Sequence, residues 1–169
     1  TQTLYQIDFV DANVGYAVGA AGTVIKTTDA GTTWTLLTAP TALAIYAIDI
    51  VTADNIYIGC SRTGSSSTGY SKMLMKTTDG GATWLDVSVA DMGTVRDVDF
   101  IDANHGWACV QNSGKVYYTT DGGTTWANST TASLVVPNYV YFINSTTGFV
   151  TNNNDGQIFK TTDGGVTWV

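Results

Sequence analysis

Aspartates at regular intervals are the residues of this chain whose type and spacing could carry chemistry. Asp97 and Asp99 lie two residues apart, and because side chains alternate along a β-strand, their carboxylates would share one face about 7 Å apart. Two carboxylates at roughly that separation can hydrolyse a glycosidic bond. A sialidase is excluded, because it needs three arginines and the sequence contains two, Arg62 and Arg96. The aspartate pair is therefore the best enzyme candidate in the sequence.

Asp99 also belongs to a second series, in which Asp8, Asp49 and Asp99 occupy equivalent positions of a repeated unit. These possible channel carboxylates could hold water or a cation at the centre of a repeat protein, or could only form hydrogen bonds there. The single histidine, His105, has no neighbouring Cys, His or Asp-rich ligand pattern. The sequence thus predicts no metal site and no cofactor.

Four copies of the motif T-T-D-(G/A)-G-x-T-W, which we call the Asp box, recur along the chain. An aspartate that bonds nearby backbone N–H groups, followed by glycine with positive φ, forms a tight turn, after which Thr and Trp resume an extended chain. The boxes lack the clustered oxygen ligands of a calcium loop, so we expect a structural role for them. Their defining residues are Asp29, Gly31, Trp34, Asp79, Gly81, Trp84, Asp121, Gly123, Trp126, Asp163, Gly165 and Trp168.

The elements that position these residues follow from the spacing of the boxes. The box tryptophans are separated by 50, 42 and 42 residues, and short β-favouring runs alternate with turns between them. Four antiparallel strands in about 42 residues are typical of one blade of a β-propeller. We therefore expect an all-β chain in which residues 1–169 form a single propeller module of four four-stranded blades. The predicted blades are 1–41, 42–91, 92–133 and 134–169.

The last blade departs from the others at its end. The sequence stops one residue after Trp168, whereas the first three boxes are each followed by a fourth strand. The last blade should then lack its outer strand, and an open propeller leaves apolar faces and a strand edge uncovered. We expect either a longer parent chain, in which this propeller is part of a larger ring, or self-association with other copies that complete it as a ring or filament.

The second blade departs from the pattern through an insertion. Serine and glycine are abundant in residues 60–72, a stretch that accounts for eight extra residues between the second and third strands of that blade. Such a composition predicts a mobile loop. Arg62, Tyr70 and Lys72 make it a possible binding loop, because an aromatic ring and two cations could stack on a sugar or grip an acidic partner. The alternative is a solvated insertion without a function.

Composition and charge limit the partners. The chain has a net charge of −7 and seven cationic residues. Because no basic stripe could neutralise phosphates, nucleic acid is excluded as a partner. The longest wholly apolar run, 42–48, is too short to cross a bilayer, so no membrane insertion is expected.

The repeats also resemble a known family. The stretches 11–19 and 22–29, and the matching stretch 102–107, are similar to the repeats of photosystem II stability and assembly factor-like propellers. These belong to the wider Asp-box group, the bacterial neuraminidase (BNR) repeats, which includes sialidases and sortilin-type receptors. The resemblance covers essentially the whole chain and implies a β-propeller. Together with the acidic, Glu-free composition, it indicates an extracellular or cell-envelope location.

One propeller scaffold serves receptors, enzymes and assembly factors alike, so the fold does not decide the function. We expect a non-catalytic module that acts by surface recognition of a protein or glycan partner and in assembly. Two alternatives stay open. The chain could be a self-associating structural subunit, or a fragment of an Asp-box glycoside hydrolase that uses Asp97 and Asp99.

Overall fold

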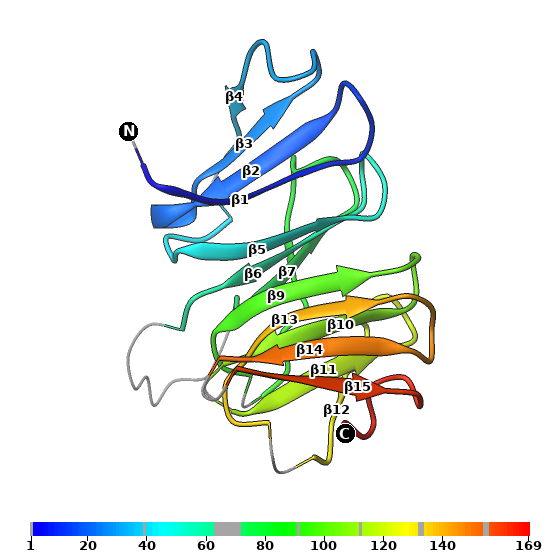
Figure 1. The fold of residues 1–169 in the computed structure, drawn as a ribbon. Coiled ribbons are helices and arrows are strands. Elements are labelled where there is room, and N and C mark those ends of the chain that lie inside the picture. The colour runs from blue at the N-terminus through cyan, green and yellow to red at the C-terminus, as the bar shows by residue number, and fades with distance from the viewer. Residues whose placement is uncertain are drawn as a thin grey trace.

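Runs of β-branched and aromatic residues, separated by turns rich in Gly, Asn and Asp, fold into four antiparallel sheets. The computed structural model describes residues 2–38, 40–62, 72–90, 92–111, 113–131, 134–153 and 156–169. In Figure 1 the first sheet lies at the top, the second lies below it, and the third and fourth sheets overlap in the lower part of the view. The all-β class and the four sheets predicted from the sequence are therefore confirmed.

Each sheet is a meander in which strands that follow one another in the chain are hydrogen-bonded neighbours. The first two sheets consist of β1 (Leu4–Phe9), β2 (Gly15–Gly19), β3 (Val24–Thr27) and β4 (Thr35–Leu36), and of β5 (Ile45–Ile50), β6 (Ile56–Cys60), β7 (Leu74–Thr77) and β8 (Leu85–Asp86). The last two consist of β9 (Val95–Phe100), β10 (Gly106–Val110), β11 (Lys115–Thr119) and β12 (Ala127–Asn128), and of β13 (Pro137–Phe142), β14 (Gly148–Asn152) and β15 (Gln157–Thr161). The expected blade limits stay a prediction.

A short 3₁₀ turn, η1 (Ala20–Gly22), joins β2 to β3. Within the described ranges, no helix has the length and apolar character needed to span a membrane.

The fourth sheet has three strands in the described part of the chain, as predicted. Val169 pairs with the third strand, because its N–H donates to the carbonyl of Lys160 (2.9 Å) and its carbonyl accepts the Lys160 N–H (2.7 Å). The N–H of Trp168 donates to Oγ1 of Thr131, 2.7 Å away, which ties this end to the segment that leads toward β13.

The hydrophobic core lies between the sheets in three clusters. The first joins Tyr16 and Val18 to Ile48 and Ile58 of the second sheet. Equivalent clusters join the second sheet to the third and the third to the fourth. Because side chains alternate along a strand, each inner sheet supplies one face to each of two clusters. The sheets therefore stack face to face, as blades do.

A polar contact accompanies each apolar interface. The aromatic residue at the second position of the second strand donates a hydrogen bond to the carbonyl of the first box glycine in the next sheet. The three contacts are Tyr16 Oη to Gly80 O (3.2 Å), Tyr57 Oη to Gly122 O (2.9 Å) and Trp107 Nε1 to Gly164 O (2.8 Å). Each sheet thus binds the Asp-box turn of the sheet that follows.

Close packing inside a sheet gives the first testable prediction. A Cβ on Gly106 would lie 2.3 Å from the ring of Phe100 on the neighbouring strand. We predict that Gly106→Ala lowers the free energy of unfolding by about 1–3 kcal/mol, because the core is overpacked. Urea denaturation measures this loss.

The matched control for this variant is Phe100→Leu, which removes the ring that a Cβ would meet. The double variant should be more stable than the sum of the two single effects predicts, because the smaller side chain relieves the clash. Strictly additive losses would contradict a clash between these two residues.

Candidate functional site

The first strands of the sheets, β1, β5, β9 and β13, lie beside one another, and we call them the inner strands. Each is bulged at its second residue. In β5, for example, Ile45 pairs with Cys60 and Ala47 pairs with Gly59, so Tyr46 has no partner in the ladder. The residues skipped in the four strands are Tyr5, Tyr46, Arg96 and Asn138. A bulge redirects the side chain of the extra residue, which is why bulges often occur at functional sites.

The four bulged residues line one groove, which we call the inner-strand groove. It has a volume of about 360 Å³ and is completed by Gln6 and Tyr139. The rings of Tyr5 and Tyr46 have centroids 5.1 Å apart, and the guanidinium carbon of Arg96 lies 4.6 Å from the centroid of the Tyr46 ring. Residues from all four sheets therefore line the groove, and two tyrosines and one arginine from the first three sheets form a column within it.

Arg96 supplies the positive charge of this groove. Among the described residues it has no ion-pair partner, and its buried Nε has no hydrogen-bond acceptor there. Stacking on Tyr46 occupies the face of the guanidinium, whereas its N–H groups donate in the plane. In an otherwise acidic chain, such an arginine attracts an anionic group, above all a carboxylate.

Sequence reasoning did not find this groove. The signal was present, because each of the four residues lies three positions before the channel position of its unit. The alternation rule, however, places that residue on the opposite face from its neighbours without indicating that a bulge turns it into a shared groove.

The aspartates of the inner strands contact the next sheet and do not line the groove. Each carboxylate accepts a backbone N–H from the following inner strand. The contacts are Asp8 Oδ2 with Ile50 N (3.2 Å), Asp49 Oδ2 with Phe100 N (2.9 Å), Asp97 Oδ2 with Val140 N (2.9 Å) and Asp99 Oδ2 with Phe142 N (2.5 Å). In the described part of the chain, no group of three or more His, Cys, Asp or Glu could hold a metal ion.

Burial raises the pKa of three of these carboxyls, those of Asp49, Asp97 and Asp99. Burial, followed by the negative charge of Asp99, raises the pKa of Asp49 to about 8. Burial also raises the pKa of Asp97 to about 7 and that of Asp99 to about 6, although a backbone N–H donor opposes each shift. The two aspartates that were the best enzyme candidate thus lie two residues apart on β9 and face β13, Asp97 buried and Asp99 half-buried.

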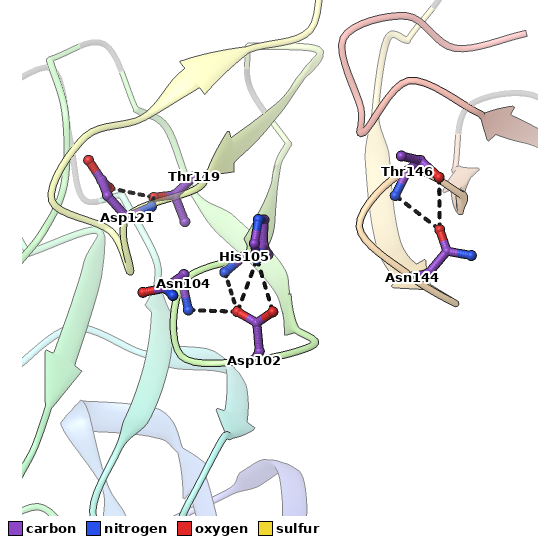
Figure 2. A network of polar contacts seen from close by, with 7 residues as sticks. All are labelled: Asp102, Asn104, His105, Thr119, Asp121, Asn144 and Thr146. Atoms are coloured by element: carbon purple, nitrogen blue, oxygen red, sulfur yellow. Dashed lines mark hydrogen bonds and ion pairs between the residues drawn. The ribbon is translucent and has the colours of Figure 1, made fainter.

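The Asp-box residues form one repeated set of hydrogen bonds. In the third box, Asp121 accepts from the hydroxyl of Thr119 (2.8 Å) and from the N–H and hydroxyl of Thr125 (2.9 and 2.6 Å). The Thr119–Asp121 contact is drawn in Figure 2. The same pattern surrounds Asp29, Asp79 and Asp163. Hydrogen bonds from Thr125 and then Thr119 lower the pKa of Asp121 to about 2, so this exposed carboxylate stays ionised.

The remaining box residues shape the turn and its packing. The second glycines, Gly31, Gly81, Gly123 and Gly165, all have positive φ, between 82° and 95°. The box tryptophan packs on its own sheet, as in the third box, where Trp126 meets Phe100 edge-on with centroids 6.1 Å apart. A structural role for the boxes, which we propose from these contacts, requires no ligand.

The other predicted residues lie elsewhere. Arg62 and Lys72 border the insertion, and Tyr70 falls within 63–71, outside the described residues. The N–H of Arg62 donates to Oγ1 of Thr94 (2.9 Å), and the N–H of Lys72 donates to Oδ2 of Asp86 (2.8 Å). The mobility and the binding role expected for this loop stay predictions.

His105 sits on the turn before β10, apart from the inner-strand groove. Its Nδ1 lies 2.9 Å and 3.1 Å from the two carboxylate oxygens of Asp102, as Figure 2 shows. Asp102 also accepts the backbone N–H groups of Asn104 and His105, and these bonds lower its pKa.

Comparison with known proteins places this site in a family. The family model described as photosynthesis system II assembly factor YCF48 matches residues 1–127. The chain belongs to this family. The resemblance inferred from the repeats is thereby confirmed, although no curated protein sequence matches the chain.

Solved structures confirm the β-propeller fold. The chain is similar to YCF48 bound to D1 peptide, with a TM-score of 0.74 and 19% identity over 100% of this chain and 55% of that one. It is similar to a GH74 enzyme from Niastella koreensis (TM-score 0.76, 19% identity, 99% and 29% covered). The computationally designed Ika4 protein is also similar (TM-score 0.73, 11% identity, 97% and 93% covered). The chain thus spans about half the length of the YCF48 chain.

The family assignment corrects one expectation. An extracellular or cell-envelope location is wrong, because the family is that of an assembly factor of photosynthesis system II, which acts where a photosystem is built. Both grounds for that expectation, the acidic, Glu-free composition and the resemblance to the wide Asp-box group, are compatible with many locations.

The raised pKa values of the buried carboxyls lead us to predict that the stability of the protein falls as the pH rises. Asp49 has a pKa of about 8 in the folded chain, against about 3.9 for an unfolded aspartate. Because the folded chain binds this proton more tightly, the free energy of unfolding should fall as the pH rises from about 5 to 9. Asp49→Asn keeps an oxygen for the Phe100 N–H and removes the charge. It should stabilise the protein by on the order of 2 kcal/mol at about pH 9.

Thermal or urea unfolding at several pH values measures this effect. Asp29→Asn is the control, because hydrogen bonds from Thr33 lower the pKa of that exposed carboxyl, so its titration lies below the tested range. A wild-type stability that rises toward pH 9, or an Asp49→Asn variant with the wild-type slope, would contradict the prediction.

Proposed function

We propose that this chain is a non-catalytic recognition module that binds a carboxylate-bearing segment of a protein partner in the inner-strand groove. The observation that carries the proposal is the Arg96 guanidinium, stacked on Tyr46 without a carboxylate partner in the described chain. Membership in an assembly-factor family supports a protein as the partner. The likeness to YCF48 bound to D1 peptide supports a peptide segment as the bound element.

The groove has the size and lining that a short peptide requires. Its volume of about 360 Å³ lies within the roughly 300–1,000 Å³ of typical ligand pockets. Tyr5, Tyr46 and Tyr139 offer aromatic surface, which contributes binding energy at a low cost in conformational entropy. The amide of Gln6 is oriented, because its Oε1 accepts the N–H of Ile48 (3.0 Å). An NH₂ group held in this way can donate to a peptide carbonyl.

The contacts of Asp97 and Asp99 support the non-catalytic part of the proposal. A glycosidase needs two carboxyl groups that flank the scissile bond. Here both carboxylates accept backbone N–H groups of β13, and neither lines the inner-strand groove. A substrate in the groove would therefore meet the arginine and the tyrosines rather than an acid and a base.

Binding of a labelled D1 peptide, followed by fluorescence anisotropy, tests this function. We expect Arg96→Ala to weaken binding by at least about tenfold, because a charge-assisted contact to a carboxylate is lost. Added salt should weaken binding to the wild type more than to the variant, since screening acts on the same contact.

Lys115→Ala provides the matched control, because it removes one positive charge at the start of β11, away from the groove lining. It should bind the peptide like the wild type. Equal affinities for wild type and Arg96→Ala would refute the proposed role of the groove, and equal losses in both variants would point to net charge alone.

A further inference from the structure

Two of the three junctions between sheets hold a lysine ammonium group beside the aromatic residue that contacts the next Asp box. Lys26 Nζ lies 5.0 Å from the centroid of the Tyr16 ring, and Lys76 Nζ lies 5.1 Å from that of Tyr57. In both sheets, lysine and tyrosine are direct partners across two strands. Lys76 Nζ also donates to the carbonyl of Gly122, 3.1 Å away. The position thus combines an aromatic face with backbone carbonyls.

The third junction has the same arrangement of an aromatic ring and a box carbonyl, which we call the frame, but it has no lysine. Trp107 takes the place of the tyrosine, and its cross-strand partner is Tyr118 instead of lysine. The box carbonyl is present, because the Trp107 indole N–H donates to Gly164. Trp107 stacks on Phe142 with centroids 3.4 Å apart, as Tyr57 in the second junction stacks on Phe100 with centroids 3.6 Å apart. All three junctions therefore have the aromatic ring and the carbonyl, and the third junction lacks the lysine ammonium group.

The surroundings of the first box glycine show the same difference. A Cβ on Gly80 would lie 3.1 Å from Lys26 Nζ, and one on Gly122 would lie 3.3 Å from Lys76 Nζ. At Gly164, the neighbour within 4 Å is the carbonyl oxygen of Ser145, at 3.1 Å, and no ammonium lies there. No lysine ammonium therefore lies beside the first box glycine of the third junction, where Tyr118 takes the lysine's position and the Trp107 ring is 2% exposed.

A pocket of about 230 Å³ lies at this place. Its lining includes His105, Trp107, Tyr118, Ser145, Asp163 and Gly164. Trp has the ring that attracts a cation most strongly. The carboxylate of Asp163 and the carbonyl of Gly164 add negative potential, while the imidazole of His105 is held by Asp102. The lining is therefore rich in acceptors and aromatic surface and suits an ammonium group on an alkyl stem.

We propose that this pocket binds a lysine side chain of a protein partner. We infer the ligand from the two other junctions, where the ammonium groups of Lys26 and Lys76 lie beside the aromatic ring. The net charge of −7 favours a partner that presents cations. This site is separate from the inner-strand groove, and the inference does not depend on the function proposed for the groove.

The test uses n-butylammonium, which mimics the lysine side chain, and n-butanol as its uncharged counterpart. The readout is the indole N–H resonance of Trp107 in a two-dimensional ¹H–¹⁵N NMR spectrum. We expect a saturable shift of this resonance with butylammonium and none with butanol. No saturable shift with butylammonium, or an equal shift with butanol, would overturn the proposal.

Tyr118→Lys is the decisive variant, because it restores the pair found in the other two junctions and should fill the pocket with the chain's own ammonium. Butylammonium should then bind at least about tenfold more weakly, as expected for a lost cation–π site. An unchanged affinity would count against the assigned site. If this variant does not fold, the comparison of the two probes on the wild type still decides.

Arg96→Ala separates the two proposals. It should respond to butylammonium like the wild type, because the groove and the pocket share no lining residue. Loss of the Trp107 shift in this variant would contradict a separate lysine site. The result of the peptide-binding experiment on the groove would not be affected.

Discussion

The contact between an aromatic side chain and the Asp-box carbonyl of the next sheet is the constraint on which the rest of the structure depends. It works because the box holds its glycines at positive φ and so points a carbonyl at the neighbouring sheet. The aromatic ring supplies buried apolar area, and its single donor fixes where the sheet lies. Stacked sheets, aligned inner strands and the shared groove all follow from that registration.

The inner strands show how the same stacking creates a polar interior. Carboxylates of one strand satisfy backbone N–H groups of the next at the expense of their own solvation, which is why burial raises the pKa of Asp49 to about 8. The bulges before them lie at Tyr46 and Arg96, which line the inner-strand groove. The structural carboxylates accept N–H groups of the next inner strand and are not part of the groove lining.

The sequence predicted the sheets well, because the chemistry of the Asp box is local: Asp121, Gly123 and their threonines define a turn wherever they occur. It also placed Asp97 and Asp99 on one face, since alternation is a property of a single strand. It could not predict the groove, because the bulge at Arg96 depends on pairing with a second strand. It also gave no reason to see the absent lysine opposite Trp107 as meaningful, because that requires knowing which side chains meet across a junction. The location was wrong, because neither the acidic composition nor the resemblance to a group with receptors and enzymes determines where a propeller acts.

The fourth sheet carries Tyr141 where the first three have aspartate, and Phe149 where they have tyrosine or tryptophan. The fourth sheet therefore lacks the carboxylate that in the other sheets accepts an N–H group of the next inner strand. It also lacks the aromatic O–H or N–H group that donates to the glycine carbonyl of the next Asp box. The blades are consequently not interchangeable units, although their sequences look alike. If the fourth blade were moved to an internal place, a backbone amide and a glycine carbonyl of the next blade would lose their partners. The order of the blades therefore matters, although their sequences are similar.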